Sequence, residues 1–446
     1  MMDRMPQELL LLIGKHIQGS SDSQNTLYSL TLCCRHFHDV FQPMIYHSLS
    51  ISSFSVGFAR LIMRLWRRPD LASQVRRLEM CWSDCSDCDQ DSADKLSEDP
   101  EVVRFIEEAL NEIFTPEEED TRSIWEQHLD TEFLCAEAWL GLLLVRANQL
   151  QTIEFGHEHS ELMSNILHKA ANRQYPFHRA PPFPYLEEVQ ACVAWGAAWI
   201  DSGFLTPFFY FPAIRTIYGS AIGERRDDEN MTLDKSYISS PVREIIVDEA
   251  YWCRGMLDWL MVCTKLEHVS INIEVQADEY EISDHEKFDA SLFRTMLLPS
   301  AKTLKTLRVC YGEWYRDKLE EHDADDAPFG TFRDFVVMED ISVRHSHLIG
   351  RISPDSTDHW DTKPLVDILP FTLQRFEIID LMESHQLQLL SQLSELVRRG
   401  CCQNLERVEF HLDLEDSDAP IDALNSLKLE CDARGIDLEV KAQEDS

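Results

Sequence analysis

The chain has 446 residues, of which 44% are hydrophobic and 27% are charged, a composition typical of a globular protein with one large or two smaller domains. Its 79 acidic residues outnumber its 41 basic residues and give a formal net charge of −38. This excess argues against nucleic acids and anionic membranes as partners, because neutralising phosphates requires Lys and Arg. It is compatible with a basic client protein or with a simple solvated surface.

The first apolar segment, MPQELLLLIGKHI, does not have the features of a secretion signal. Its apolar core from Leu9 to Ile13 is about half the usual length, and acidic residues flank it. No run approaches the roughly 18 apolar residues of a membrane span. We therefore expect a cytoplasmic or nuclear protein whose 13 cysteines are reduced thiols.

This segment predicts a helix that begins at Pro6, because a proline fits the first helical turn, where an N–H would have no partner. Its apolar stripe consists of Leu9, Leu10, Ile13 and Ile17. A second helix is predicted after a polar turn, with apolar positions at Leu27, Leu30, Cys33, Cys34 and Phe37. The next segment runs from Pro43 toward a short strand. The apolar stripe serves either a partner or packing on the rest of the chain.

A further helix is expected around FARLIMRLW, ended by Pro69. Its apolar positions are Phe58, Leu61, Ile62 and Leu65. An acidic segment follows at about 83–130. It makes the distance between the first two copies of the repeat described below about twice the usual distance. We expect an inserted helix there, with a stripe formed by Val102, Phe105, Ile106, Ala109, Leu110 and Ile113.

From residue 75 onward, a pattern of apolar-x-x-apolar-x-apolar recurs ten times, which is the core signature of a leucine-rich repeat. The copies begin at Val75, Leu150, Leu186, Ile214, Val242, Leu266, Leu304, Met338, Leu373 and Leu405. Each hexapeptide predicts a strand, and the segments between them predict returning helices. One such helix, in GMLDWLMVC, is expected to present Met256, Leu257, Leu260 and Met261 on one face. The uneven spacing and the missing asparagine ladder indicate an irregular array.

Two motifs suggest metal sites. CWSDCSDC places Cys81, Cys85 and Cys88 at a spacing found in iron–sulfur enzymes, but Asp87 replaces their usual aromatic residue and no fourth ligand for zinc follows. The histidines of GHEH, His157 and His159, fit a solvent loop better than a metal site. No nucleophile elbow, phosphate loop or H-E-x-x-H motif is present, so we predict no catalytic residue, metal or cofactor.

The segments MPQELLLLIGKHI and LYSLTLCCRHFHDVFQPMIYHSL resemble an F-box, with Met5 in place of the usual leucine and a longer polar turn. The junction FARLIMRLWRRPDLASQVRRLEM resembles that of fungal F-box proteins with leucine-rich repeats, so the resemblance covers nearly the whole chain. It implies an α/β protein with an all-α F-box at 1–50, a helical linker at 51–74 and an irregular leucine-rich-repeat domain at 75–446. Parallel strands would form its concave face, with helices outside.

The resemblance also implies a function. The F-box would dock onto the Skp adaptor of a cullin–RING ubiquitin ligase, and the chain would be its non-catalytic substrate receptor. The matching adaptor-contacting or helix-packing positions are Pro6, Leu9, Leu10, Ile13, Leu30, Cys34 and Phe37. The alternative is a protein-binding scaffold with no role in ubiquitylation.

A client protein would meet the residues between the apolar positions of the strands, because these side chains point away from the core. The predicted client column consists of Glu79, Glu154, Gln190, Tyr218, Ile246, Ser270, Arg308, Ser342, Glu377 and Glu409. Its neighbouring column consists of Arg77, Thr152, Glu188, Thr216, Glu244, His268, Thr306, Asp340, Arg375 and Arg407. Tyr218 and Ile246 would form an apolar centre with a charged rim. For any one residue, a solvated strand position is the simpler interpretation, so the prediction concerns the face and not a particular residue.

Overall fold

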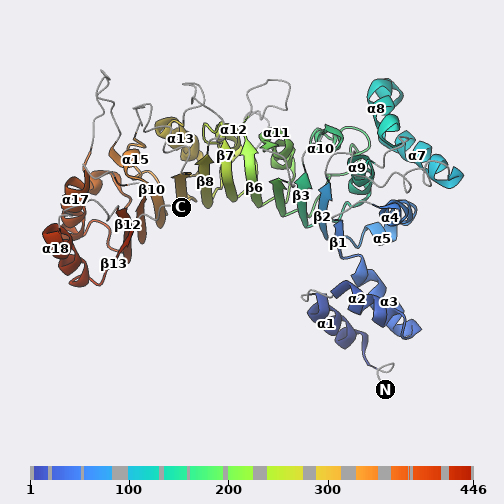
Figure 1. Cartoon of the computed structure of the whole chain (residues 1–446), viewed down its shortest axis with the longest axis horizontal. Helices are drawn as coiled ribbons and strands as arrows, with labels where there is room; N and C mark the ends of the chain where they lie inside the picture. Colours follow the sequence, from blue (N-terminus) through green and yellow to red (C-terminus); the bar gives the residue numbers. More distant parts are fainter. Residues whose placement is uncertain are drawn as a thin grey trace. The chain divides into compact units, whose positions relative to one another are not determined.

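The structure is a computed structural model, and it describes residues 5–18, 23–51, 55–82, 99–129, 135–157, 161–193, 199–224, 239–274, 288–312, 328–349, 363–379, 381, 385–412 and 421–442. The chain divides into two compact units. The first comprises Met1–Ile200 with Tyr210–Ile214, and the second comprises Asp201–Phe209 with Arg215–Ser446. Each unit combines parallel strands with helices, which confirms the predicted α/β class (Figure 1).

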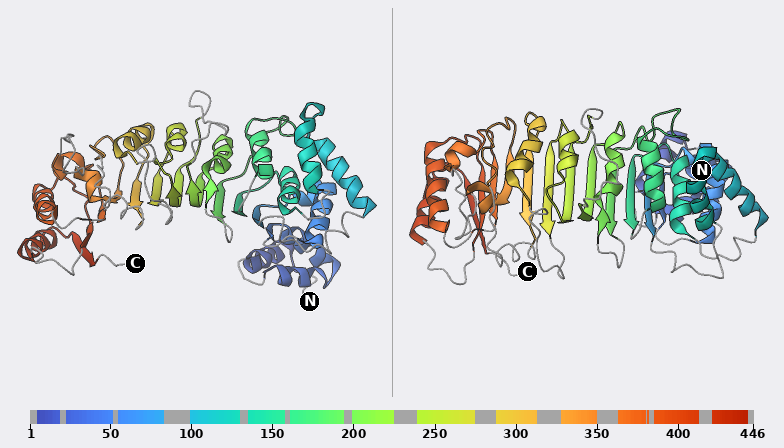
Figure 2. Two further views of the ribbon diagram at one scale, coloured as in Figure 1. Left: turned by 45° about the horizontal axis from the view of Figure 1, so that its top comes forward. Right: turned by 90° about the horizontal axis from the view of Figure 1, so that it is seen from above.

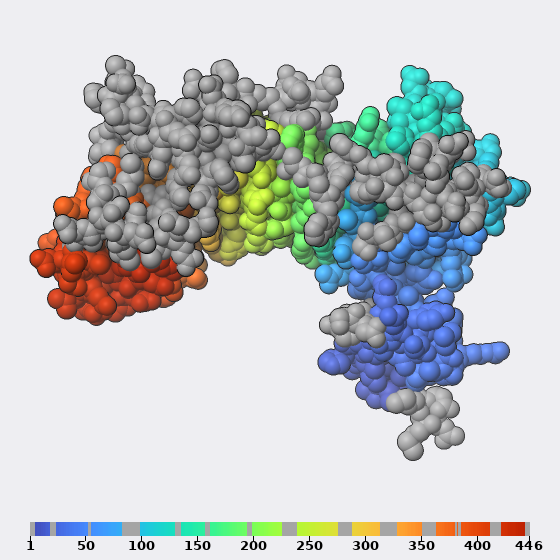
Figure 3. Space-filling model, in the orientation of Figure 1, coloured from blue at the N-terminus to red at the C-terminus, as the bar shows by residue number. Residues whose placement is uncertain are grey.

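The first unit begins with three short helices, α1 (Gln7–Gln18), α2 (Ser23–Thr31) and α3 (Arg35–Ile45). They pack together as a compact body, coloured dark blue in Figure 3. Their buried core consists of Leu10, Leu27, Phe37, Val40 and Phe41. The rings of Phe37 and Phe41 meet edge to face with centroids 5.5 Å apart, a favourable aromatic geometry.

The single helix predicted around Leu27 to Phe37 is wrong, because α2 ends at Thr31 and α3 begins at Arg35. Cys34 has an extended backbone and caps α3, and its Sγ accepts a hydrogen bond from the Phe37 N–H at 3.5 Å. A residue with extended dihedrals interrupts the helical hydrogen-bond ladder, so the chain turns between the two helices. Pro43 lies inside α3, and the short strand predicted after it is β1 (Ser48–Ile51).

Four consecutive strands of the first unit pair in parallel: β1 (Ser48–Ile51), β2 (Arg77–Trp82), β3 (Thr152–His157) and β4 (Glu188–Val193). The intervening helices are α4 (Val56–Arg67), α5 (Pro69–Ala72), α7 (Pro100–Ile113), η3 (Pro116–Glu118), α8 (Glu119–Leu129), α9 (Ala136–Arg146) and α10 (Glu161–Ala171). The expected linker helix is α4, which ends before Pro69, and the expected inserted helix is α7. The acidic segment that precedes α7 lies outside the described residues.

Large aromatic side chains hold the helices of the first unit together. Trp66 of α4 meets Phe105 of α7 edge to face at 6.0 Å, and Phe105 stacks on Trp139 of α9 at 5.8 Å. Trp125 of α8 is fully buried and lies against Gly141 of α9. The inserted helices are therefore part of the hydrophobic core of this unit.

The contact at Gly141 predicts a stability effect. A Cβ on this residue would lie 2.5 Å from Cη2 of Trp125, too close for a buried ring. Alanine favours a helix over glycine by about 1 kcal/mol, but overpacking costs about 1–3 kcal/mol. We expect Gly141→Ala to lower the free energy of unfolding, measured in urea, by about 1 kcal/mol.

The matched control is Gly57→Ala in the first turn of α4, where the nearest atom to the added Cβ is 3.6 Å away. We expect this substitution to leave stability unchanged or to raise it slightly. Equal stabilisation by both substitutions would show that Trp125 does not limit the space at Gly141.

The eight strands of the second unit that follow Ile214 pair in parallel and in chain order: β6 (Thr216–Gly223), β7 (Glu244–Tyr251), β8 (His268–Glu274), β9 (Thr306–Tyr311), β10 (Asp340–Arg344), β11 (Arg375–Ile379), β12 (Arg407–Leu412) and β13 (Asp437–Ala442). The two-residue strand β5 (Ile200–Asp201) precedes them in sequence. The helices are α11 (Ser202–Leu205), η4 (Thr206–Tyr210), α12 (Leu257–Val262), α13 (Ala290–Leu297), η5 (Leu298–Ser300), α15 (His345–Ile349), α16 (Leu365–Ile368), α17 (Gln386–Arg399) and α18 (Ile421–Asp432). Figures 1 and 2 show α11, α12 and α13 along one side of β6–β8.

All ten predicted hexapeptides form strands, namely β2, β3, β4 and β6–β12. Strand β13 was not predicted, because Gly435 stands where the other copies begin with an apolar residue. The predicted face of α12 is partly wrong: Trp259, Leu260 and Val262 are buried in this helix, whereas Leu257 and Met261 are half-buried.

Buried histidines lie next to the C-terminal end of β10. His347 is fully buried, and its Nε2 lies 3.1 Å from the hydroxyl of Tyr311. His345 is 3% exposed, and its ring centroid lies 5.4 Å from that of His385. Burial, followed by the charge of His385, lowers the pKa of His345 to about 3.

This shift predicts acid sensitivity. The folded chain holds His345 neutral, whereas the unfolded chain binds a proton near pH 6.5, so proton binding favours unfolding. The stabilisation is present above pH 6.5 and is lost as the pH falls toward 3, by at most about 1.4 kcal/mol per pH unit. Urea unfolding at pH 7.5 and pH 5.0 should show a smaller pH difference for His345→Gln than for the wild type.

The control is His16→Gln, which removes an exposed histidine of α1. It should keep the pH difference of the wild type. If His345→Gln keeps it as well, a different group is responsible for any acid sensitivity.

Candidate functional site

In the first unit, the predicted polar columns lie in register across β2, β3 and β4. Glu79 pairs with Glu154, and Glu154 pairs with Gln190. In the neighbouring column the aligned residues are Arg77, Thr152 and Glu188. Burial and the adjacent charge of Glu79 raise the pKa of Glu154.

In the second unit, both columns continue in register from β6 to β12. The client column comprises Tyr218, Ile246, Ser270, Arg308, Ser342, Glu377 and Glu409. The neighbouring column comprises Thr216, Glu244, His268, Thr306, Asp340, Arg375 and Arg407. Sequence reasoning missed their continuation on β13, where Glu439 pairs with Glu409 and Asp437 pairs with Arg407.

The predicted apolar centre on β6 and β7 has a polar component. Tyr218 and Ile246 are aligned and half-buried, as an apolar centre requires. The hydroxyl of Tyr218 donates a hydrogen bond to Oδ2 of Asp248 at 2.9 Å. The ring is therefore held over the sheet by a carboxylate of the next strand.

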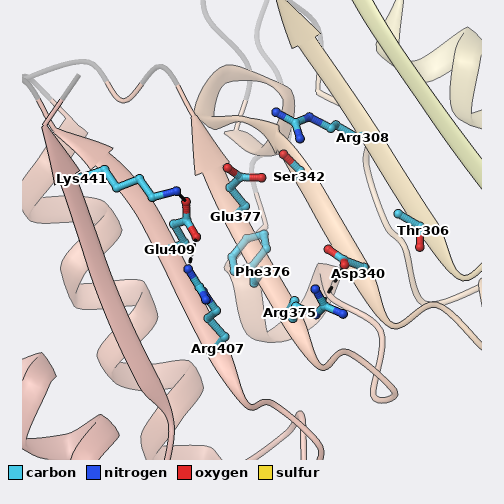
Figure 4. Close-up of a pocket in the computed structure, with 10 residues that line it drawn as sticks. All are labelled: Thr306, Arg308, Asp340, Ser342, Arg375, Phe376, Glu377, Arg407, Glu409 and Lys441. Atoms are coloured by element: carbon cyan, nitrogen blue, oxygen red, sulfur yellow. Dashed lines mark hydrogen bonds and ion pairs between the residues drawn. The ribbon is translucent and has the colours of Figure 1, made fainter. Parts of the chain in front are cut away.

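A groove of about 370 Å³ lies over β9–β13 (Figure 4). Its lining residues are Thr306, Arg308, Asp340, Ser342, Arg375, Phe376, Glu377, Arg407, Glu409 and Lys441. All of them except Phe376 and Lys441 belong to the two predicted columns. The second unit thus gathers eight of the predicted residues into one concave site.

At one end of the groove, the charges are paired. Glu409 accepts a hydrogen bond from Nη2 of Arg407 at 2.9 Å and forms an ion pair with Lys441. Arg407 also pairs with Glu439 of β13. Burial opposes ionisation of Glu409, but the bonds from Lys441 and Arg407 hold its pKa below the usual value.

In the middle of the groove, Asp340 and Arg375 form an ion pair in which Oδ2 and Nε are 3.6 Å apart. Burial raises the pKa of Asp340, and the charge of Arg375 opposes this shift.

At the other end of the groove, Arg308 and Ser342 take no part in the ion pairs described above. The Nε of Arg308 donates to Sγ of Cys310 at 3.4 Å, and no carboxylate of the described residues forms an ion pair with this guanidinium. The Oγ of Ser342 is buried and has no hydrogen-bond partner there.

Ser342 and Glu409 are not simple solvated strand positions, because they are only 4% and 8% exposed. Arg308 and Glu377 flank Ser342 in register, and Glu377 and Glu439 flank Glu409.

The predicted adaptor residues divide into two groups. Leu10 and Phe37 are in the core of the three helices, and Leu30 and Cys34 are partly buried against it. Pro6 is exposed, and Leu9 and Ile13 are 49% and 42% exposed.

Sequence reasoning missed three further exposed apolar residues: Leu12 at 62%, Tyr28 at 58% and Leu32 at 70%. The spacing of Leu9, Leu12 and Ile13 on α1 could have identified this outer stripe. The outer face of α1 is thus available for a partner.

The two metal motifs fall mainly outside the described residues, which contain neither Cys85, Cys88 nor His159. Burial, with the charge of Glu79, raises the pKa of Cys81 and disfavours its thiolate. Across the described ranges, no three Cys, His, Asp or Glu side chains are grouped as a metal site. Within those same ranges, no helix is both long and apolar enough to cross a membrane.

The sequence matches no protein-family model, and no curated protein matches it. Among solved structures, it is similar to a structural-genomics crystal structure of a protein from Bacteroides fragilis, with a TM-score of 0.32 and 10% sequence identity. That match covers 74% of this chain and 74% of the other chain. A similarity at this level carries no argument about function.

The paired end of the groove predicts a stability effect. Glu409→Gln keeps the side-chain shape but removes the negative charge that pairs with Arg407 and Lys441, so these two cations face a neutral amide oxygen. We expect the free energy of unfolding to fall by about 1–2 kcal/mol in urea denaturation at pH 7.

The matched control is Glu439→Gln on β13, whose side chain is 40% exposed and pairs with Arg407. Its effect should be smaller, because exposed ion pairs contribute little. A larger effect at Glu439 than at Glu409 would contradict the assignment of Glu409 as the centre of this network.

Proposed function

We propose that this protein is the substrate-recognition subunit of a Skp–cullin–F-box ubiquitin ligase. Its first three helices act as an F-box that binds the Skp adaptor, and its strand–helix repeats bind a client protein. The observation that carries the proposal is the two-faced helix α1: Leu10 is 2% exposed, whereas Leu9, Leu12 and Ile13 are 42–62% exposed. This division lies within the segment whose sequence resembles an F-box.

The outer stripe of α1 has the chemistry of a protein-docking surface. Fully burying a leucine or isoleucine side chain is worth roughly 1.5–3 kcal/mol, so three partly exposed ones offer a partner several kcal/mol. The five buried residues beneath form a small core that fixes the direction of the stripe. The exposed Tyr28 and Leu32, at the second helix and the turn after it, extend the apolar character of this module.

The repeats supply the receptor part of the proposal. In each unit, every β-α segment adds one strand beside the previous one, as expected for an irregular leucine-rich-repeat array. The strand faces opposite the helices present aligned polar columns to a client. The 370 Å³ groove over β9–β13 lies on this surface in the second unit.

This protein would contribute to ubiquitin transfer by bringing the reacting groups close together. A client held on the repeats, with the adaptor held on α1, would bring client lysines near a ubiquitin-charged enzyme bound elsewhere in the complex. No residue of this chain would form or break a bond. A scaffold without ubiquitylation would use the same two surfaces, but its client would not accumulate when adaptor binding is lost.

The adaptor interface is tested by co-expression with a Skp adaptor. We expect stable association of the wild type and at least tenfold weaker binding of the double variant Leu9→Asp, Ile13→Asp, because two carboxylates would be buried in an apolar interface. Affinity is measured by isothermal titration calorimetry with the purified chains.

Leu429→Asp is the matched control, because Leu429 of α18 is 71% exposed and lies in the other unit. It should bind as the wild type does. Absence of binding by a folded wild-type chain would refute the ligase proposal. Binding without client accumulation in cells that carry the double variant would favour the scaffold.

A further inference from the structure

The end of the groove that contains Arg308 and Ser342 is formed by side chains of adjacent strands. Arg308 of β9 pairs in register with Ser342 of β10, and Ser342 pairs with Glu377 of β11. Figure 4 shows Arg308 and Ser342 side by side above the sheet. Ser342 is 4% exposed, and its Oγ has no hydrogen-bond partner among the described residues. A buried hydroxyl without a partner is costly, and it gains most from a ligand that accepts a hydrogen bond from it.

The charges of the groove favour an acidic ligand. Its lining contains the cations Arg308, Arg375, Arg407 and Lys441 and the anions Asp340, Glu377 and Glu409. Arg407 and Lys441 pair with Glu409, and Arg375 pairs with Asp340. Arg308 forms no such ion pair with a described carboxylate, although the charges of Glu377 and Asp248 act on it. This positive charge contrasts with the net charge of −38 on the chain.

The dimensions fit a peptide segment. Four strand spacings of about 4.8 Å separate β9 from β13, a span of roughly 19 Å that about six extended residues would cover. Phe376 also lines the groove, but it is 1% exposed and occupies a buried apolar position of β11, so the polar side chains of Arg375 and Glu377 on either side of it form the groove surface. An extended peptide would therefore cross the strands, and its side chains would point alternately toward the charged rows of the groove and toward the solvent.

We propose that the groove over β9–β13 binds an extended client segment through an acidic residue, whose carboxylate pairs with Arg308 and accepts a hydrogen bond from Ser342. This inference rests on the proposed receptor function and specifies its client class. The guanidinium and the hydroxyl together supply the donors that a carboxylate requires. The flanking Arg308 and Glu377 are long side chains, so a change of rotamer opens access to Ser342. Glu377 repels a second acid, which limits the preference to one position.

The test is selection from a phage-displayed library of random dodecapeptides on the purified full-length chain. The wild type should enrich peptides that share one Asp or Glu position. Arg308→Glu should enrich Lys or Arg at that position instead, because the sign of the anchoring charge is reversed. A synthetic wild-type-selected peptide with Glu changed to Gln should bind the wild type roughly tenfold more weakly.

Several controls separate anchoring from unfolding. Arg308→Gln should reduce binding of the acidic peptide without a new preference, and Ser342→Ala should weaken it several-fold. Lys428→Gln removes one exposed charge of α18 in the same unit and should bind normally. Each selected peptide is made with a free and with an amidated C-terminus. Equal affinity identifies a side-chain carboxylate, and loss on amidation identifies a chain-terminal one.

Recovery of no peptide by the wild type, or the same acidic preference in Arg308→Glu, overturns the inference. The selection contains neither adaptor nor ubiquitin, so its failure leaves the adaptor test unaffected. Success here with no adaptor binding would keep the groove as a peptide site and remove the ligase.

Discussion

The register of the parallel strands is the constraint on which the rest of the second unit depends. Each strand places apolar residues at matching positions, for example Ile245, Val269 and Leu307 on β7, β8 and β9. Because side chains alternate between the two faces, a slip of one residue would bury the polar row and expose the core. The apolar face is covered by helices, so that slip is strongly disfavoured.

The same register explains an irregularity in β6 and β7. Ala221 and Glu249 both have positive φ angles, and the pairing of β7 with β8 shifts between Val247 and Ala250. The extra residue is absorbed as a bulge, after which Ala250 pairs with Ile273 and the apolar face resumes. A local deviation thus preserves the alternation over the rest of the sheet.

Polar rows created by this register bring like charges together. Glu377, Glu409 and Glu439 stand side by side on β11, β12 and β13. The row is tolerated because Arg407 and Lys441 supply cations from neighbouring positions. Arg407 and Lys441 pair with glutamates at the β12–β13 end, whereas Arg308 on β9 forms no ion pair with a described carboxylate. Charge compensation within the sheet therefore differs between the two ends of the groove.

The three N-terminal helices follow a different principle. Their core is small, so α1 cannot bury all of its apolar residues against α2 and α3. Leu10 faces inward, and Leu9, Leu12 and Ile13 remain on the outside. One helix thereby stabilises its own module and exposes an apolar stripe on its outer face.

The sequence by itself determined the strands and their two columns, because apolar side chains at alternate positions specify which face is buried wherever the copies begin with an apolar residue. It also determined α1, α4 and α7, whose prolines and apolar stripes are local signals. Only the tertiary structure decided that Cys34 separates two helices, that Leu12 is exposed and that β13 extends the sheet despite Gly435. It alone decided that Ser342 is buried beside Arg308 with no hydrogen-bond partner for its Oγ among the described residues. Ion pairs between strands, such as Asp340 with Arg375 and Arg407 with Glu439, join residues that are far apart in the sequence, so no local pattern shows which charges pair.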